Sequence, residues 1–230
     1  PNSQLELSGG WGGNTFVGTL GVSFNNFSIR RVFEKSAWRP VPLGDGQTLS
    51  IRFQTNGTYY TALSASFMEP WLTGKKPTSL STSVYYTRQT NSYYYYLTND
   101  EYMEVYGIAA SLGSRLKWPD DYFVLYHELS WQAYNLHDWG YNFLFSTGQS
   151  NNFSYKATLS RNSTDQQVFP RQGSDFTFSV QLTPPYSLFR DQNLDYSSMS
   201  DQERYRWIEY HKWSFKGAVY TKLVGGLVLM

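Results

Sequence analysis

Histidine and serine are the residues to weigh first for chemistry, because the chain has no cysteine. Without cysteine there is neither a disulfide nor a thiolate metal site. His127, His137 and His211 lack the paired spacing of metal ligands. A serine hydrolase would need converging Ser, His and acidic residues, and no Gly-x-Ser-x-Gly elbow is present. The sequence therefore predicts no enzyme activity, no metal and no cofactor.

Aromatic residues are unusually frequent, at 19% of the 230 residues, with 20 Tyr, 15 Phe and 8 Trp. A soluble domain seldom has enough core to bury so many, whereas a membrane barrel places them in girdles at both water interfaces. The net charge of +1 gives no electrostatic reason to expect nucleic acid as a partner. Composition thus favours a protein in contact with a lipid bilayer.

Strands, not helices, are expected to cross that bilayer. No apolar run approaches the roughly 20 residues that a spanning helix needs. A spanning strand needs only about 10 tilted residues, of which one face is apolar. The mean hydropathy of -0.49 is compatible with such strands.

Apolar and polar residues alternate along most of the chain, as in half-apolar strands. The predicted apolar face consists of Phe16, Gly18, Leu20, Val22, Phe24, Leu49, Ile51, Phe53, Thr61, Leu63, Ala65, Phe67, Leu80, Thr82, Val84, Tyr106, Ile108, Ala110, Leu112, Phe123, Leu125, His127, Leu129, Trp131, Phe153, Tyr155, Ala157, Leu159, Phe176, Phe178, Val180, Leu182, Trp213, Phe215 and Val219. Charged residues such as Arg52, Glu128 and Lys156 fall on the other face. A Lys or Arg facing lipid at mid-bilayer would cost about 2–4 kcal/mol, whereas a wet lumen tolerates it.

The pattern predicts an all-β fold, a transmembrane antiparallel β-barrel in which ten strands are followed by an eleventh beginning at Gly226. The other fold that alternates in this way is a soluble β-sandwich. Its buried face would favour Val, Ile and Leu, and it would not need aromatic residues at so many strand ends.

Connection lengths indicate the orientation of the strands, since outer loops of such barrels are long and periplasmic turns are short. The expected outer loops are residues 87–102, 137–152 and 184–211, and the expected turns are residues 70–77, 117–121 and 168–175. The exceptions are a tight outer hairpin at residues 56–58 and a long periplasmic insertion at residues 25–46. In the last outer loop, residues 200–203 fit a capping box that opens a short helix to about Lys212.

Several segments, in this order and spacing, resemble the BamA family of outer-membrane barrels. They are a glycine-rich first strand (Glu6–Gly12), an Asn-Asn-Phe turn (Asn25–Phe27), a strand and turn at residues 63–72, a strand at residues 80–86, and an aromatic-Pro-x-x-Gly turn formed by Phe169, Pro170 and Gly173. The resemblance implies a barrel of sixteen strands in the bacterial outer membrane. The insertion at residues 28–46 and the long loop 184–211 depart from the family and suggest a distant lineage.

The resemblance also implies that residues 1–230 are the N-terminal portion of the barrel domain of a longer protein. Periplasmic POTRA domains, the Arg-Gly-Phe motif of the sixth loop and the C-terminal strands are not in this sequence. The partners that it implies are unfolded β-barrel clients, accessory assembly lipoproteins and the lipid bilayer.

Three functions share these features: an insertase that folds other barrels, a passive channel or porin, and a related secretion transporter. The first strand discriminates the first two, because a porin needs a firmly paired seam. Residues 9–13 read Gly-Gly-Trp-Gly-Gly, and glycine weakens a strand. We therefore expect an insertase whose first strand pairs through its main chain with a client strand. The expected client-binding residues are Leu5, Glu6, Leu7, Ser8, Gly9, Gly10 and Trp11.

Overall fold

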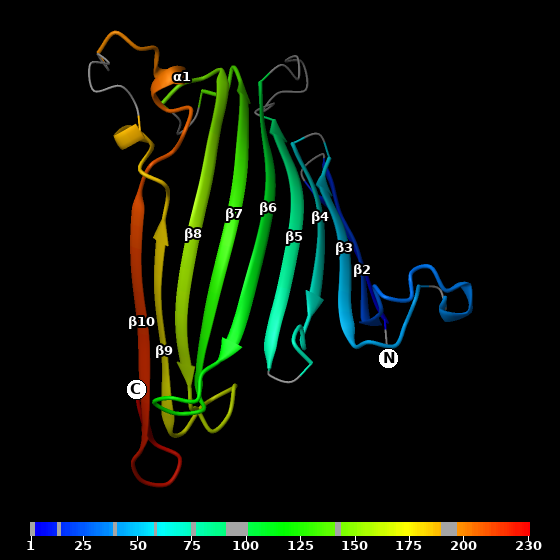
Figure 1. Ribbon diagram of the computed structural model, residues 1–230, viewed down its shortest axis with the longest axis vertical. Coiled ribbons are helices and arrows are strands. Elements are labelled where there is room, and N and C mark those ends of the chain that lie inside the picture. Colours follow the sequence, from blue (N-terminus) through cyan, green and yellow to red (C-terminus); the bar gives the residue numbers. More distant parts are fainter. Residues whose placement is uncertain are drawn as a thin grey trace.

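A computed structural model describes residues 3–12, 15–38, 41–57, 59–74, 77–90, 101–140, 144–189 and 197–230. These residues form one antiparallel sheet of eleven strands, in which every strand pairs with its neighbours in sequence. Figure 1 shows the strands side by side, with the helix α1 (Asp201–Arg204) at one end of the sheet and the turns at residues 116–122 and 163–172 at the other. Chain order and sheet order are therefore the same, as in an up-and-down barrel.

β1 to β10 have 10–15 residues each and are long enough to cross a bilayer, whereas β11 has 2. Their bounds are β1 Ser3–Gly12, β2 Thr15–Phe27, β3 Gln47–Asn56, β4 Tyr60–Glu69, β5 Thr78–Thr90, β6 Tyr102–Arg115, β7 Phe123–His137, β8 Gly148–Asn162, β9 Gly173–Leu182, β10 His211–Lys222 and β11 Val228–Leu229. The helical pieces are short: η1 Lys35–Ala37, η2 Tyr186–Phe189 and α1 Asp201–Arg204. Within the described ranges, no helix combines the length and the apolar character needed to cross a membrane.

The register confirms the predicted alternation, because residues directly opposite each other in an antiparallel sheet point to the same face. One continuous row across eight strands consists of Leu5, Val22, Ile51, Ala65, Val84, Ile108, Trp131 and Phe153. The adjacent row on the opposite face contains Glu6, Gly21, Arg52, Ser64, Tyr85, Gly107, Gln132 and Asn152. The sheet thus has one apolar face and one polar face.

Burial is inverted relative to a soluble domain. Val84, Ile108 and Leu129 are about half exposed, at 49%, 50% and 51%. On the polar face, by contrast, Ser154 is only 1% exposed and Asn152 is 8% exposed. A soluble sandwich would bury the first group and expose the second, so the apolar face is the one that contacts lipid.

The predicted helix in the long β9–β10 connection is shorter than expected. Ser200 does cap α1, since its Oγ accepts a hydrogen bond from the Glu203 N–H at 3.4 Å. The helix ends at Arg204, however, and does not reach Lys212. The following backbone pairs with β8 instead: the Asn151 N–H donates to the Arg206 carbonyl at 2.8 Å. Those main-chain groups are consequently not available to an α-helix.

Other boundaries also differ from the sequence prediction. The Asn25–Phe27 segment is the end of β2, with a register shift before Phe27, and not a free turn. β5 continues to Thr90 and β8 begins at Gly148, so two outer loops are shorter than expected. The tyrosine run at residues 93–96 lies outside the described residues. In each corrected case hydrogen bonds to the neighbouring strand extend the strand beyond the end of its alternation.

Candidate functional site

The first strand, β1, lies at one edge of the sheet formed by the described residues, and β11 lies at the other. β1 pairs with β2 along its whole length, from Ser3 to Gly12, and with no other strand in the described part of the chain. Its residues 3–11 are all exposed. The edge therefore presents main-chain N–H and C=O groups in a row, which is the arrangement that another strand can pair with.

The predicted site residues divide between the two faces of β1. Leu5, Leu7 and Trp11 are 71%, 77% and 79% exposed, and Leu5 and Leu7 share the lipid face with Val22 and Leu20. Glu6, Ser8 and Gly10 alternate with them and lie on the polar face. The structure thus brings all seven residues together on one strand, with the alternation that a membrane-facing edge needs.

Side-chain packing between β1 and β2 is sparse. Gly9 lies opposite Gly18, and Glu6 lies opposite Gly21, so two cross-strand positions contain at most one side chain. A Cβ added at Gly10 would meet no atom within 4 Å. Since cross-strand side-chain pairs provide much of the cohesion of a sheet, the β1–β2 pair is weakest around Gly9 and firmer at the Leu5–Val22 and Leu7–Leu20 pairs.

One ion pair connects β1 to the sheet beyond β2. The Arg52 guanidinium of β3 donates to the Glu6 carboxylate at 2.6 Å, passing over Gly21 of β2. A Cβ at Gly21 would lie 3.3 Å from the Glu6 carboxylate, so glycine leaves room for this contact. Both side chains are about half exposed, at 56% and 51%, and such pairs contribute about 0–1 kcal/mol.

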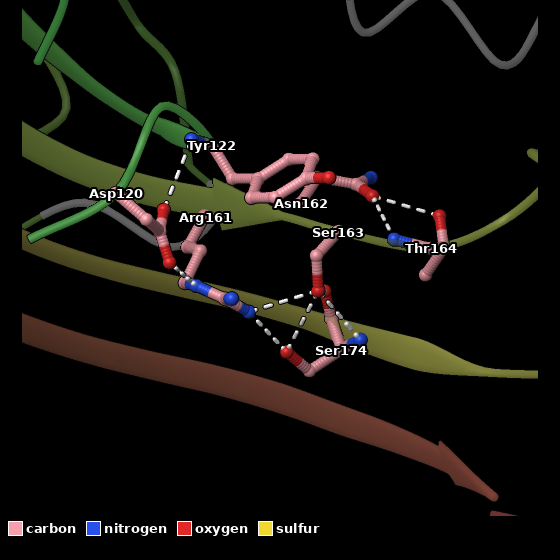
Figure 2. Close-up of polar contacts among 7 residues, drawn as sticks. All are labelled: Asp120, Tyr122, Arg161, Asn162, Ser163, Thr164 and Ser174. Atoms are coloured by element: carbon pink, nitrogen blue, oxygen red, sulfur yellow. Dashed lines mark hydrogen bonds and ion pairs between the residues drawn. The ribbon is translucent and has the colours of Figure 1, made fainter. Parts of the chain in front are cut away.

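A second polar cluster lies far from β1 in the strand order and joins the β6–β7 turn to the β8–β9 turn (Figure 2). The Arg161 guanidinium at the end of β8 contacts the Asp120 carboxylate at 2.9 Å. It also donates to the Ser163 and Ser174 hydroxyls at 2.9 and 2.5 Å. Asp120 in turn accepts a hydrogen bond from the Tyr122 N–H at 2.9 Å. This cluster fixes the β6–β7 turn against the β8–β9 turn.

The aromatic-Pro-x-x-Gly turn follows this cluster, in the β8–β9 connection. Phe169 has a φ of 55° and is 86% exposed. Gly173 has a φ of 108°, and a Cβ there would lie 2.3 Å from the Ser163 carbonyl oxygen. The glycine of the motif is therefore required by the backbone. Pro170 is partly exposed, between these two constrained positions.

Asp165 organises the same turn from inside it. Its carboxylate accepts hydrogen bonds from the N–H groups of Arg171 and Gln172, at 2.9 and 3.3 Å. These bonds, the one from Arg171 foremost, lower the pKa of the Asp165 carboxyl below its ordinary value. The turn is thus built from main-chain contacts of an ionised side chain.

The three histidines do not form a site. His127 lies on the apolar face, where its Nδ1 is 2.5 Å from the Tyr155 hydroxyl. His137 stacks on Tyr102 at the outer end of β7, with ring centroids 5.2 Å apart. His211 is the first residue of β10. Among the described residues no group of His, Asp and Glu is arranged to hold a metal ion.

The sequence pattern missed charged groups on the apolar side, among them Glu69 opposite Leu80, Arg88 opposite Glu104, and the two described next. Arg161 continues the apolar face of β8 beyond Leu159, and Glu104 of β6 lies on that face near its outer end. The Glu104 carboxylate accepts hydrogen bonds from the Tyr86 and Tyr106 hydroxyls, at 2.8 and 3.3 Å. Arg161 and Glu104 both lie at strand ends beside aromatic residues, at the depth of the hydrated lipid headgroups. Their positions in the strands were the signal that could have predicted charged residues there.

Comparison with known proteins identifies the family. A model of the Omp85 superfamily domain matches residues 42–228. Among solved structures, BamA from Haemophilus ducreyi lacking POTRA domains 1–3 superimposes with a TM-score of 0.51 at 20% identity. The match covers 80% of this chain and 34% of that one, so the chain spans about a third of the BamA structure.

No curated protein matches the sequence. The BamA structure shares the fold of this chain, and the superfamily model covers most of its residues. The predicted resemblance is confirmed at both levels, and the fold indicates the bacterial outer membrane. The chain belongs to the Omp85 superfamily.

Proposed function

We propose that this chain is part of the central barrel subunit of the machinery that folds and inserts β-barrel proteins into the outer membrane. The observation that carries the proposal is the glycine-containing pairing of β1 with β2, in which Gly9 lies opposite Gly18 and Glu6 lies opposite Gly21. Membership of the Omp85 superfamily and the fold shared with BamA support it.

The proposed mechanism is templating by the main chain. An unsatisfied backbone group in lipid costs several kcal/mol, so a free edge at membrane depth favours any strand that can pair with it. An unfolded client strand would add to β1 between Leu5 and Trp11. Weak β1–β2 cohesion at Gly9 and Gly18 then allows β1 to bend toward the client. Each step is a hydrogen-bond exchange that needs no cofactor.

The partners follow from this mechanism. The clients are unfolded outer-membrane β-barrel proteins, and the lipid bilayer surrounds the apolar face. We further propose that accessory assembly lipoproteins bind the full-length protein, and that POTRA domains and C-terminal barrel strands complete it. The chain covers 34% of the matched BamA chain, so these parts belong to the proposal.

A passive porin would require the opposite seam, with a first strand that is firmly packed. The pairing of Gly9 with Gly18 does not favour it. A secretion transporter of the same superfamily differs in what passes through the barrel, and an assay of client assembly separates it from an insertase.

The test is a reversible lock on β1. The 230 residues contain no cysteine, so Ser8→Cys can be paired with one cysteine in the final strand of the barrel. We expect the oxidised protein to remain folded while client assembly in cells stops, and reductant to restore assembly.

A matched control forms a disulfide between two central strands. Ser130 of β7 and Ser154 of β8 lie opposite each other, with hydroxyls 2.9 Å apart. The Ser130→Cys/Ser154→Cys protein should assemble clients normally when oxidised. Normal assembly by the β1-locked protein would contradict the proposed function.

A further inference from the structure

The described parts of the insert between β2 and β3, residues 28–38 and 41–46, have a rigid hydrogen-bonded base. Ser28 is fully buried and its hydroxyl donates to the Asp45 carboxylate at 2.6 Å. Gln47, 2% exposed, accepts a hydrogen bond from the Ile29 N–H at 2.7 Å and donates to Glu69 of β4 at 2.6 Å. Buried polar groups bonded on several sides hold the insert in one position relative to the sheet.

The rest of the insert is closed on itself. The Ser28 N–H donates to the Pro42 carbonyl at 2.9 Å, and the Leu43 N–H donates to the Ala37 carbonyl at 3.3 Å. The indole N–H of Trp38 donates to the Val32 carbonyl at 3.1 Å. Figure 1 shows the insert projecting sideways from the lower ends of β2 and β3, instead of continuing along their direction.

Apolar side chains are exposed at the tip of this structure. Phe33 is 95% exposed, Ile29 is 53% exposed and Trp38 is 48% exposed. A rigid segment that holds three large apolar side chains in water indicates a surface that is covered in the working protein.

Basic side chains surround these apolar residues. Arg30, Arg31 and Lys35 are exposed, and among the described residues none of them takes part in an ion pair. Glu34 is the one acidic residue between Ser28 and Lys35, and Asp45 is bonded to Ser28. The tip is therefore both apolar and positively charged.

The position of the insert at one end of the strands indicates that lipid headgroups cover its exposed apolar side chains. It leaves the sheet at the same end as the β4–β5 turn, where Trp71 and Leu72 are 56% and 44% exposed. At its base Phe27 packs edge-on against Phe67, with ring centroids 6.3 Å apart. Aromatic residues gathered at one end of membrane strands mark the depth of the lipid headgroups.

We propose that the β2–β3 insert binds the surface of the periplasmic leaflet beside the first strand. Phe33, Ile29 and Trp38 enter the interface, and Arg30, Arg31 and Lys35 bind the anionic headgroups of phospholipids. This combination of exposed apolar and basic residues is the one by which segments lie in a membrane interface. Bound there, the insert holds the periplasmic end of β2, and through it β1, at a fixed depth. The proposal requires the barrel and its orientation but not the insertase activity.

The test measures depth with a spin label. Ser36, which is exposed within η1, is replaced by cysteine and labelled in the native protein, reconstituted in vesicles of phosphatidylethanolamine with or without phosphatidylglycerol. We expect the label to be shielded from a water-soluble relaxation agent in the anionic vesicles. A label at Gly140→Cys, in the exposed outer β7–β8 connection, is the matched control and should be accessible in both.

Two variants of the labelled protein separate the contributions. Arg30→Gln/Arg31→Gln should lower the ratio of immersed to water-exposed label about 25-fold in anionic vesicles, since each basic residue near such a surface contributes roughly fivefold. Phe33→Ser should expose the label in both kinds of vesicle, whereas Phe189→Ser should not change it, although Phe189 of η2 is also highly exposed, at 81%. Heat-modifiable mobility on a gel confirms that each variant is folded.

A label that is water-exposed in both vesicles would overturn the proposal. So would a label that is exposed in vesicles but shielded in native membranes, which would indicate a periplasmic protein as the partner. Either result would leave the proposed insertase activity intact, because assembly of clients is assayed separately.

Discussion

β1 and β7 are strands of the same sheet with opposite surroundings. β7 pairs with β6 on one side and, from Phe123 to Leu136, with β8 on the other. Its Ser130 and Gln132 are hydrogen-bonded to Ser154 and Asn152 of β8, at 2.9 and 3.2 Å. β1 pairs on one side, and its ion pair with Arg52 is half exposed.

The comparison is between a strand paired on both sides and a strand at the edge of the described sheet. The central strands are held by main-chain pairing on both sides together with side-chain hydrogen bonds on the polar face. In the first strand Gly9 lies opposite Gly18, so one cross-strand side-chain pair with β2 is missing.

Proline should produce the largest difference between the two strands. Ser130→Pro removes a main-chain donor from a strand paired on both sides, which costs several kcal/mol in a bilayer, and we expect no folded barrel. In β1 the outcome should depend on direction, since alternate N–H groups point to opposite edges. Ser8→Pro and Gly10→Pro should behave alike, and Gly9→Pro should behave oppositely.

A proline variant whose replaced residue pointed its N–H away from β2 should leave the barrel folded but impair client assembly. A variant whose replaced residue donated its N–H to β2 should instead lower the temperature at which the barrel loses its folded mobility on a gel. If Ser8→Pro and Gly9→Pro had the same effect on both measurements, the free-edge description of β1 would be wrong.

Glycine substitutions give the next largest difference. Gly173→Ala places a Cβ at a φ of 108° and 2.3 Å from a carbonyl oxygen, and should destabilise the barrel by about 1–3 kcal/mol. Gly10→Ala in β1 meets open space and should be neutral or slightly stabilising. The midpoint of denaturant unfolding in vesicles measures both, and equal midpoints for the two variants would contradict the account of the turn.

Breaking the Arg161–Asp120 ion pair should destabilise the barrel more than breaking the Arg52–Glu6 ion pair of β1. Arg161→Gln breaks contacts to Asp120, Ser163 and Ser174, and its side chain is only 23% exposed, so we expect a loss of about 1–2 kcal/mol. Arg52→Gln breaks the exposed pair with Glu6 and should cost less than about 1 kcal/mol. The same unfolding assay compares them, and a larger loss for Arg52→Gln would mean that β1 is held more firmly than its exposure indicates.

The smallest expected effect is a pH dependence confined to the β8–β9 turn. Because the folded pKa of Asp165 is lowered, its stabilisation is complete above the ordinary carboxyl pKa. It is lost as the pH falls below about 4, through the lowered folded value. Asp165→Asn should remove this dependence from amide exchange at Arg171 and Gln172, and no corresponding change is expected in β1. An unchanged pH profile in the variant would show that other groups control the turn.

The fold was largely predictable from the sequence because the two-residue period is local. Alternation placed Leu63, Val84 and Ile108 on one face, and the register of the sheet confirms it. Chain order could be predicted too, because neighbouring membrane strands are joined by simple connections.

The parts that could not be predicted depend on contacts between distant residues. Whether the chain after Arg204 continues as a helix is decided by Asn151 of β8, which binds that backbone. Arg161 and Asp120 are 41 residues apart, and no local pattern pairs them. The β1 edge was predicted from its glycines, but the exchange of strands at that edge remains a prediction.

The most direct measurement of the central claim is a crosslink between client and template. Single cysteines at Ser8 and Gly10 of β1 are each tested against cysteines along the terminal strand of a client during assembly in cells. We predict that both positions crosslink to the client. The client residue that crosslinks to position 10 should lie two residues along the client strand from the one that crosslinks to position 8, because paired strands keep a fixed register. Ser130→Cys in β7 should capture no client. Client crosslinks that are absent from β1, or as frequent at Ser130 as at Ser8, would contradict templating by the first strand.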